Sequence, residues 1–225
     1  MNIVLFGDEK RRLELKNRLS ELSNVHFSQS TADLVEADLV VDLNFDESPD
    51  NWPAYANLED ALVLVCSVKR SLAEILAEHD VEVLCQLVGL NALPSFLSRP
   101  SWELSLWKDT DQEEAAMILK TLGVTPLFVK DRVGMMMPRV LFMIMNEACY
   151  TLQEGTATIA DIDLAMKLGT NYPHGPFEWM DKIGIEHVYE TLLAIQEDTG
   201  DSRYKICSLL KQQYLNKELW KADSK

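Results

Sequence analysis

The sequence is poor in positive charge. Its 225 residues include 21 lysines and arginines against 36 aspartates and glutamates, which gives a formal net charge of −15 at pH 7. A chain this acidic repels the phosphates of nucleic acids and the surface of anionic membranes. It also disfavours anionic ligands, unless a local basic patch offsets the charge. We therefore expect no nucleic-acid partner.

Long hydrophobic runs are also missing. The longest candidate, MMMPRVLFMIM at 135–145, contains Pro138 and Arg139 and is too short to span a bilayer. The N-terminus enters a strand-like apolar run directly, without the basic segment and apolar stretch of a secretory signal. These absences predict no membrane segment and a cytoplasmic location.

Cysteine is sparse and scattered. Cys66, Cys85, Cys149 and Cys207 lie far apart, and no pair has the spacing of a metal site or of a Cys-x-x-Cys motif. The four histidines show no metal-ligand spacing either. We expect buried, reduced thiols and no metal.

Strand-like and helical patterns alternate through the first 130 residues. Strands are expected at 1–9, 25–29, 36–46, 61–67, 82–91, 101–108 and 125–130, and helices at 9–22, 71–78 and 110–124. Such alternation predicts an α/β domain with a parallel, doubly wound sheet. From Gly134 onward the pattern is helical nearly throughout, which predicts an all-α second domain.

The stretch 129–184 strongly resembles the helical C-terminal domain of the 3-hydroxyacyl-CoA dehydrogenases. It carries Lys-Asp at a strand end (130–131), Asn-Glu-Ala in a helix (146–148), Asp-Ile-Asp at 161–163 and a Tyr-Pro-x-Gly-Pro-Phe-Glu corner at 172–178. The resemblance implies a truncated Rossmann-like domain at 1–129 and a helical domain at 130–225. In that family the helical domain dimerises and closes over an acyl-CoA, so it also implies a homodimer and an acyl-CoA ligand.

The resemblance also locates candidate catalytic residues. In the family a histidine takes the proton of the 3-hydroxyl group, a glutamate orients that histidine, and an asparagine and a serine assist. Asn91 stands in the place of the histidine, Glu103 in that of the glutamate and Pro138 in that of the asparagine, while Ser71 lies near the serine. An asparagine cannot take a proton near neutral pH, so the general base is missing. Helix capping alone would explain Ser71, and Glu103 can equally be a solvated strand carboxylate.

The dinucleotide-binding loop of the family is degenerate. Gly7 is the candidate cofactor residue, because it matches the first glycine of the Gly-x-Gly-x-x-Gly fingerprint. Asp8 and Glu9 place carboxylates where a diphosphate binds, and Arg11 and Arg12 are expected on a solvated helix face. The family implies NAD, yet this loop leads us to expect no cofactor.

Lys69 and Arg70 are a candidate substrate-binding pair, because they precede a helix start at which a phosphate could bind. Three interpretations remain open. The favoured one is a family member with weakened or lost catalysis that keeps acyl-CoA binding and dimerisation. The alternatives are an active NAD-dependent oxidoreductase of 3-hydroxyacyl-CoA in fatty-acid metabolism, with a rearranged site, and a structural homodimer without a ligand.

Overall fold

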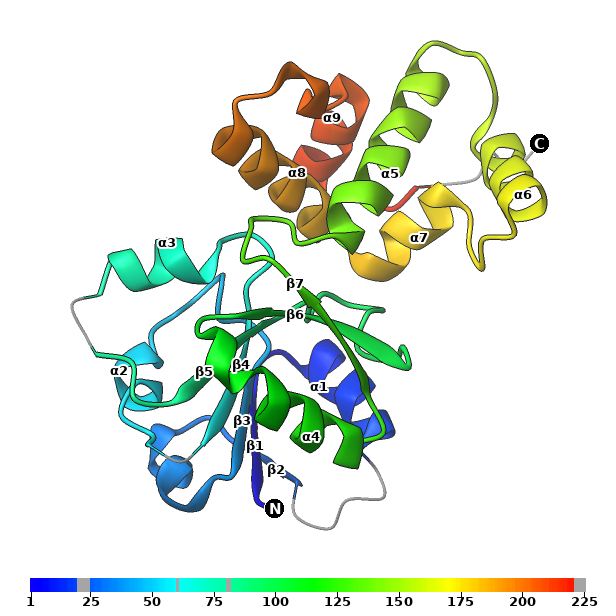
Figure 1. The fold of residues 1–225 in the computed structure, drawn as a ribbon. Coiled ribbons are helices and arrows are strands. Elements are labelled where there is room, and N and C mark those ends of the chain that lie inside the picture. The colour runs from blue at the N-terminus through cyan, green and yellow to red at the C-terminus, as the bar shows by residue number, and fades with distance from the viewer. Residues whose placement is uncertain (20–24, 60, 80–81, 221–225) are drawn as a thin grey trace. The chain divides into compact units, whose positions relative to one another are not determined.

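The computed structural model describes residues 1–19, 25–59, 61–79 and 82–220. The chain divides into two compact units, Met1–Met135 and Met136–Lys225 (Figure 1). The first unit is α/β and the second is helical, and each is described here by itself.

The first unit is built on a seven-stranded sheet with the order β2-β1-β3-β4-β5-β6-β7. Its strands are β1 (Ile3–Phe6), β2 (Val25–Phe27), β3 (Leu39–Asp42), β4 (Leu62–Cys66), β5 (Gln86–Leu90), β6 (Ser101–Leu106) and β7 (Thr125–Val129). Its helices are α1 (Glu9–Arg18), α2 (Trp52–Tyr55), α3 (Leu72–Ala77) and α4 (Gln112–Thr121), with 3₁₀ turns η1 (Thr31–Glu36) and η2 (Asp109–Asp111). The predicted strands and helices are confirmed with shorter bounds, except that positions 20–22 of the helix predicted at 9–22 lie outside the described residues.

The sheet departs from the predicted parallel arrangement at one place. Strands β1 to β5 pair in parallel, but β6 is antiparallel to β5, and β7 is parallel to β6. Residues 91–100, which link β5 to β6, contain no helix. A link this short suits antiparallel neighbours, because a parallel pair needs a crossover of roughly a dozen residues or more. Helix α4 supplies such a crossover between β6 and β7.

Both faces of the central strands β1, β3 and β4 are covered, so these strands are buried along their whole length. On one face Val4, Val40 and Val63 join a buried cluster with Trp52 of α2 and Ile75 of α3. Helices α1 and α4 lie on the opposite side of the strands (Figure 1). The sequence pattern gave no sign of α2, although Trp52 and Tyr55 are fully buried.

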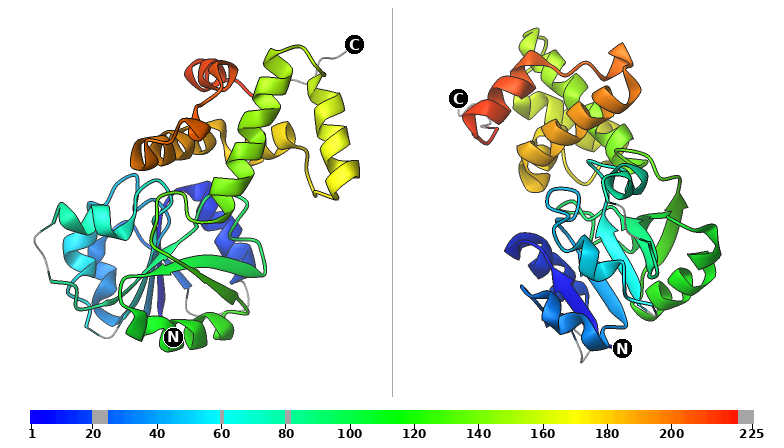
Figure 2. Two further views of the ribbon diagram at one scale, coloured as in Figure 1. Left: turned by 45° about the horizontal axis from the view of Figure 1, so that its top comes forward. Right: turned by 90° about the vertical axis from the view of Figure 1, so that its left-hand side faces the viewer.

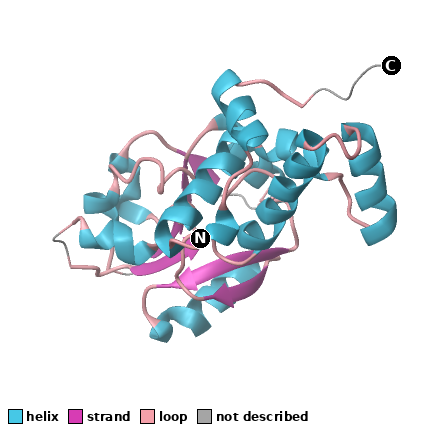
Figure 3. Cartoon of the chain, turned by 90° about the horizontal axis from the view of Figure 1, so that it is seen from above, coloured by secondary structure: helices cyan, strands magenta, loops and turns pink. Residues whose placement is uncertain are grey.

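The second unit contains helices without strands among its described residues (Figure 3). They are α5 (Met137–Gln153), α6 (Ile159–Thr170), α7 (Pro176–Ile183), α8 (Ile185–Thr199) and α9 (Ser208–Asn216), with a 3₁₀ turn η3 at Ser202–Tyr204 (Figure 2). The expectation of an all-α second domain is confirmed. Over the described residues, no helix is long and apolar enough to cross a membrane.

The corner between α6 and α7 is held by Asp163. Its two carboxylate oxygens accept hydrogen bonds from the main-chain nitrogens of Phe177 (2.9 Å) and Glu178 (3.1 Å). A Cβ atom at Gly175 would overlap the Asp163 side chain, so this position requires glycine. Phe177 and Trp179 are buried in the core of the unit. The dense motif at 169–184 is therefore a structural corner.

Candidate functional site

The candidate residues Gly7, Lys69, Arg70, Ser71 and Asn91 lie in the loops that follow β1, β4 and β5, while Glu103 lies within β6. In a doubly wound fold, ligands bind at this carboxyl edge of the parallel strands. The question at each loop is whether its polar groups are available to a ligand or are already bonded within the chain.

The N-terminus of α1 already carries an anion. Asp8 is its N-cap residue, and one carboxylate oxygen accepts a hydrogen bond from the main-chain nitrogen of Arg11 at 3.0 Å, while Arg11 Nε donates to the other. Burial raises the pKa of Asp8, but the hydrogen bonds and charge of Arg11 outweigh it, so the pKa is lowered overall. The carboxylate therefore lies at the helix end where a phosphate would otherwise bind.

Arg11 does not lie on a solvated helix face, contrary to the expectation from the sequence. It is 1% exposed, and its guanidinium also donates to the carbonyl oxygen of Leu43 and, at 3.3 Å, to a carboxylate oxygen of Glu47. Such a buried guanidinium needs several acceptors, and the loop after β3 supplies them. The periodicity of α1 cannot signal these partners, because they lie more than 30 residues away.

The backbone conformation and close packing at position 7 explain why it is a glycine. Its φ is +134°, and a Cβ atom there would lie 2.7 Å from Leu43 Cβ and 2.8 Å from Asn44 Oδ1. Asn44 Oδ1 in turn accepts a hydrogen bond from the main-chain nitrogen of Asp8 at 2.8 Å. The glycine thus allows the side chain of Asn44 to approach the turn and accept this hydrogen bond.

Two further carboxylates bind the loop between β4 and α3. Asp46 Oδ2 accepts hydrogen bonds from the main-chain nitrogens of Val68 (2.8 Å) and Lys69 (2.7 Å). Asp131 accepts from those of Leu72 (2.9 Å) and Ala73 (3.0 Å). The sequence analysis missed Asp46, and it placed Asp131 in the family motif without a role.

The candidate substrate-binding residues of this loop are also engaged within the chain. Lys69 Nζ lies 2.9 Å from Glu47 Oε1, and Arg70 Nη2 lies 2.6 Å from Glu78 Oε1. Ser71 forms a capping box with Glu74, so helix capping accounts for it. A phosphate here would have to compete with the chain's own carboxylates for each of these groups.

Asn91 and Glu103 are brought together as the resemblance implies. Asn91 Nδ2 donates to Glu103 Oε2 at 3.0 Å, and Asn91 N donates to the Glu103 carbonyl oxygen at 3.0 Å. The two residues are 2% and 4% exposed, so Glu103 is not a solvated strand carboxylate. The pair has a carboxylate in place to orient a neighbour, but the neighbour is an amide without a basic nitrogen.

The residue at the family position of the asparagine is neither an acid nor a base. Pro138 is buried in the first turn of α5, where proline is favoured because its missing N–H group has no intrahelical acceptor there.

All four cysteines are free and buried, as predicted. No group of three or more potential ligands that could hold a metal occurs among the described residues.

The residues at this edge do not fit NAD, the cofactor that the Rossmann-like fold suggests. The second and third fingerprint positions carry Glu9 and Arg12, and no glycine stands at either. Asp8 caps the helix end where the diphosphate would bind, and Asp42, at the end of β3, is buried against Tyr55 with a hydrogen bond of 2.8 Å.

Comparison with known proteins assigns the chain to a family. The family described as 3-hydroxyacyl-CoA dehydrogenase, C-terminal domain, matches residues 134–225. The helical unit therefore carries the C-terminal domain of this family, and the comparisons support a 3-hydroxyacyl-CoA dehydrogenase family member. Its fold agrees with this assignment.

Relatives with curated names support the assignment. The chain is 41% identical over 107 residues to a 3-hydroxyadipyl-CoA dehydrogenase of Escherichia coli, covering 48% of this chain and 22% of that protein. It is 27% identical over 197 residues to a 3-hydroxybutyryl-CoA dehydrogenase of Bradyrhizobium diazoefficiens, covering 84% of this chain and 67% of that protein. The chain thus spans about a fifth of the first relative and two thirds of the second.

A solved structure extends the likeness in fold to both units. The crystal structure of (S)-3-hydroxybutyryl-CoA dehydrogenase from Ralstonia eutropha aligns with a TM-score of 0.73 at 22% identity, covering 96% of this chain and 86% of that one. At this identity the likeness shows the fold.

Proposed function

We propose that this protein binds a coenzyme A thioester and forms a homodimer through its helical unit, and that it does not by itself catalyse the dehydrogenation for which the family is named. The ligand class follows from the names of the relatives, which act on 3-hydroxyadipyl-CoA and 3-hydroxybutyryl-CoA. The loss of catalysis follows from the residues of this chain.

The observation that carries the proposal is the buried pair of Asn91 and Glu103. An amide at the position of the base cannot accept the proton of a 3-hydroxyl substrate, and the Glu103 carboxylate beside it is buried and accepts a hydrogen bond from that amide. General-base catalysis contributes roughly 10²–10⁴-fold to a rate, so this change alone would weaken turnover severely.

The chain's own charges at the cofactor edge support the same conclusion. Asp8, Arg11, Glu47 and Lys69 form one continuous network of ion pairs. Binding a dinucleotide would require Asp8 to leave the helix end, which would strip the buried Arg11 of an acceptor. A missing base and an obstructed cofactor site act against turnover independently.

The surface of α6 supports dimerisation. None of its residues is buried within the chain, and Leu164 and Leu168 are 53% and 77% exposed. Val140 of α5 is likewise 58% exposed. Exposed large apolar side chains are common at interaction surfaces, and the resemblance to the family implies dimerisation through this unit.

The test combines binding, turnover and mass. Acetoacetyl-CoA and NADH are titrated separately into the purified protein by calorimetry, and turnover is followed as loss of nicotinamide absorbance. We expect acetoacetyl-CoA to bind, NADH to bind no more tightly than ADP, whose nucleotide it contains, and no turnover. Light scattering at micromolar concentration should give the mass of a dimer. NADH oxidation that depends on acetoacetyl-CoA would refute the loss of catalysis.

The Asn91→His variant is the control for the missing base. An imidazole beside Glu103 restores the family's residue type, yet we expect no activity because the cofactor edge is unchanged. Recovery of activity in this variant would show that NAD can bind after all. Absence of acetoacetyl-CoA binding together with a dimer mass would favour a structural homodimer.

A further inference from the structure

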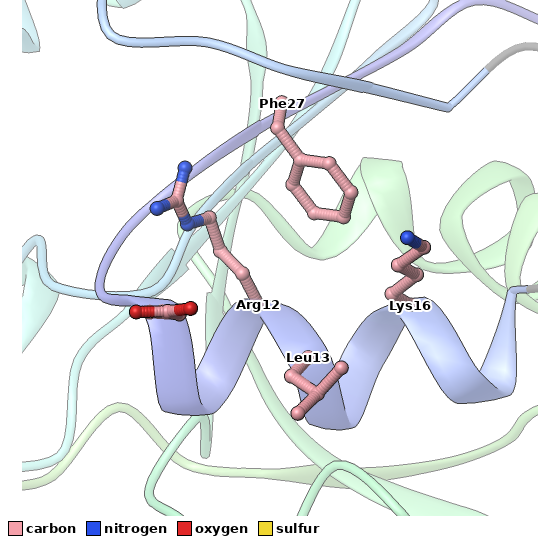
Figure 4. A pocket seen from close by; sticks show the side chains of 5 residues that line it. Arg12, Leu13, Lys16 and Phe27 are labelled. Atoms are coloured by element: carbon pink, nitrogen blue, oxygen red, sulfur yellow. The ribbon is translucent and has the colours of Figure 1, made fainter.

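A hollow lies beside α1 that none of the functions considered above uses. Its volume is about 260 Å³, and it is lined by Glu9, Arg12, Leu13, Lys16 and Phe27. The four helix residues recur at three- and four-residue spacing and so form one stripe along α1, while Phe27 comes from the edge strand β2. Figure 4 shows the Phe27 ring above the helix, with Arg12 on one side and Lys16 on the other.

The two cations of this hollow differ from those at the cofactor edge. Arg11, Lys69 and Arg70 each have a carboxylate partner within 3.3 Å. Over the described part of the chain, Arg12 and Lys16 form no ion pair. Arg12 Nε is also buried without a hydrogen-bond acceptor among these residues. An unsatisfied buried donor costs free energy, and an anionic ligand in the hollow would relieve that cost.

The hollow also offers an aromatic surface. The Arg12 guanidinium lies over the Phe27 ring, 5.8 Å from its centroid, and Leu13 beside it is 56% exposed. Aromatic rings and guanidinium groups are the groups on which planar bases stack. At the N-terminal end of the stripe, the exposed Glu9 carboxylate can accept hydrogen bonds from hydroxyl or amino groups but repels phosphate.

We propose that this hollow binds a nucleoside phosphate. The base stacks on Phe27, the phosphate contacts Arg12 and Lys16, and Glu9 accepts a hydrogen bond from the sugar or the base. The proposal goes beyond the function argued above, since it concerns α1 and β2 and no step of acyl-CoA binding depends on it. The same chemical group occurs in free nucleotides and at the nucleotide end of coenzyme A, so the experiment has an arm for each source.

Calorimetric titration of ADP into the full chain tests the site. We expect a dissociation constant on the order of 0.1–1 mM, because the hollow is shallow and few contacts are made. The double substitution Arg12→Ala/Lys16→Ala should weaken binding at least tenfold, and raising NaCl from about 50 to 200 mM should weaken the unmodified chain as well. Lys120→Ala/Lys130→Ala removes the same charge from exposed positions elsewhere in the first unit and should change nothing.

Phe27→Leu separates stacking from charge. It should weaken ADP roughly tenfold, the scale of base–aromatic stacking, and leave pyrophosphate binding unchanged because pyrophosphate has no base. Circular dichroism establishes that each variant is folded. No ADP binding up to about 5 mM, or equal ADP affinity in the Arg12→Ala/Lys16→Ala variant, would overturn the proposal.

Coenzyme A titrated into the same proteins identifies the source. If Arg12→Ala/Lys16→Ala loses both ADP and coenzyme A, the hollow holds the nucleotide end of coenzyme A. If it loses ADP and keeps coenzyme A, the hollow is a separate site for free nucleotides. Failure of the function proposed above is read from a different result, namely that acetoacetyl-CoA binds neither the unmodified chain nor the variant.

Discussion

Asp8 and Arg11 bind each other across the first turn of α1. The carboxylate accepts from both the main-chain nitrogen and the guanidinium of Arg11, and that guanidinium extends to the loop after β3. This contact turns a helix end that could hold a phosphate into part of an internal network with Glu47 and Lys69.

Arg11→Met should lower the free energy of unfolding by about 3–5 kcal/mol, the cost of removing one partner from a buried ion pair. The substitution keeps much of the side-chain volume but leaves Glu47 and the Leu43 carbonyl without this donor. Urea unfolding followed by tryptophan fluorescence measures the change. Lys16→Met, at an exposed position of the same helix, is the matched control and should shift stability by less than about 0.5 kcal/mol. Equal effects of the two substitutions would argue against the network.

The Asp8 carboxylate should make stability depend on acid pH. Its pKa in the folded protein lies below its ordinary value of 3.8, so its stabilising effect is complete above pH 3.8 and is lost as the pH falls through the lower folded value. Asp8→Asn keeps a capping side chain but removes the charge, and should cost about 1 kcal/mol at pH 7. The difference from the unmodified chain should shrink below pH 3.8 in urea titrations. A difference that stays constant across this range would rule out the carboxylate charge as its source.

Substitution of Gly175 and of Gly169 by alanine should change the stability of the helical unit in opposite directions. Gly175→Ala puts a Cβ atom into the Asp163 side chain and should destabilise the helical unit by about 2–3 kcal/mol, as overpacking does. Gly169→Ala, inside α6 with no atom within 4 Å of the new Cβ, should stabilise by about 0.4–1 kcal/mol. Thermal unfolding of the two variants gives both signs. A destabilised Gly169→Ala variant would mean that a Cβ atom at this exposed helix position has an unfavourable contact that the single chain does not show.

The thiols should be unreactive in the native state. Burial raises the pKa of Cys85 to about 12, and it also raises the pKa values of Cys66 and Cys149. At pH 8 the thiolate fraction of Cys85 is then about 10⁻⁴, so labelling by Ellman's reagent should await unfolding. The absorbance released by Ellman's reagent is compared with and without 6 M guanidinium chloride, a concentration about twice a common unfolding midpoint. The comparison distinguishes the thiols of the native protein from those of the unfolded protein. Rapid labelling of any cysteine without denaturant would contradict the burial described here.

Local patterns in the sequence were sufficient for much of the fold. Continuous apolar runs gave the strands, because strands buried on both faces are apolar along their whole length. The capping residues Ser71 and Glu74 gave the start of α3, and glycine and proline gave the corner at 169–184. The resemblance placed Asn91 opposite Glu103, and the two do form a hydrogen bond.

What the sequence could not reveal depends on contacts between distant residues. The reversal of β6, the burial of Arg11 and the roles of Asp46 and Asp131 were all outside its reach. Arg11 has the charge and spacing of a surface residue, and acceptors from another loop are what make its burial tolerable. The sequence by itself determined the resemblance to the family and the asparagine that stands at the position of its histidine. Tertiary structure decided that the polar groups in the loops after β1, β3 and β4 bind one another, because hydrogen-bond partners are chosen by proximity in space.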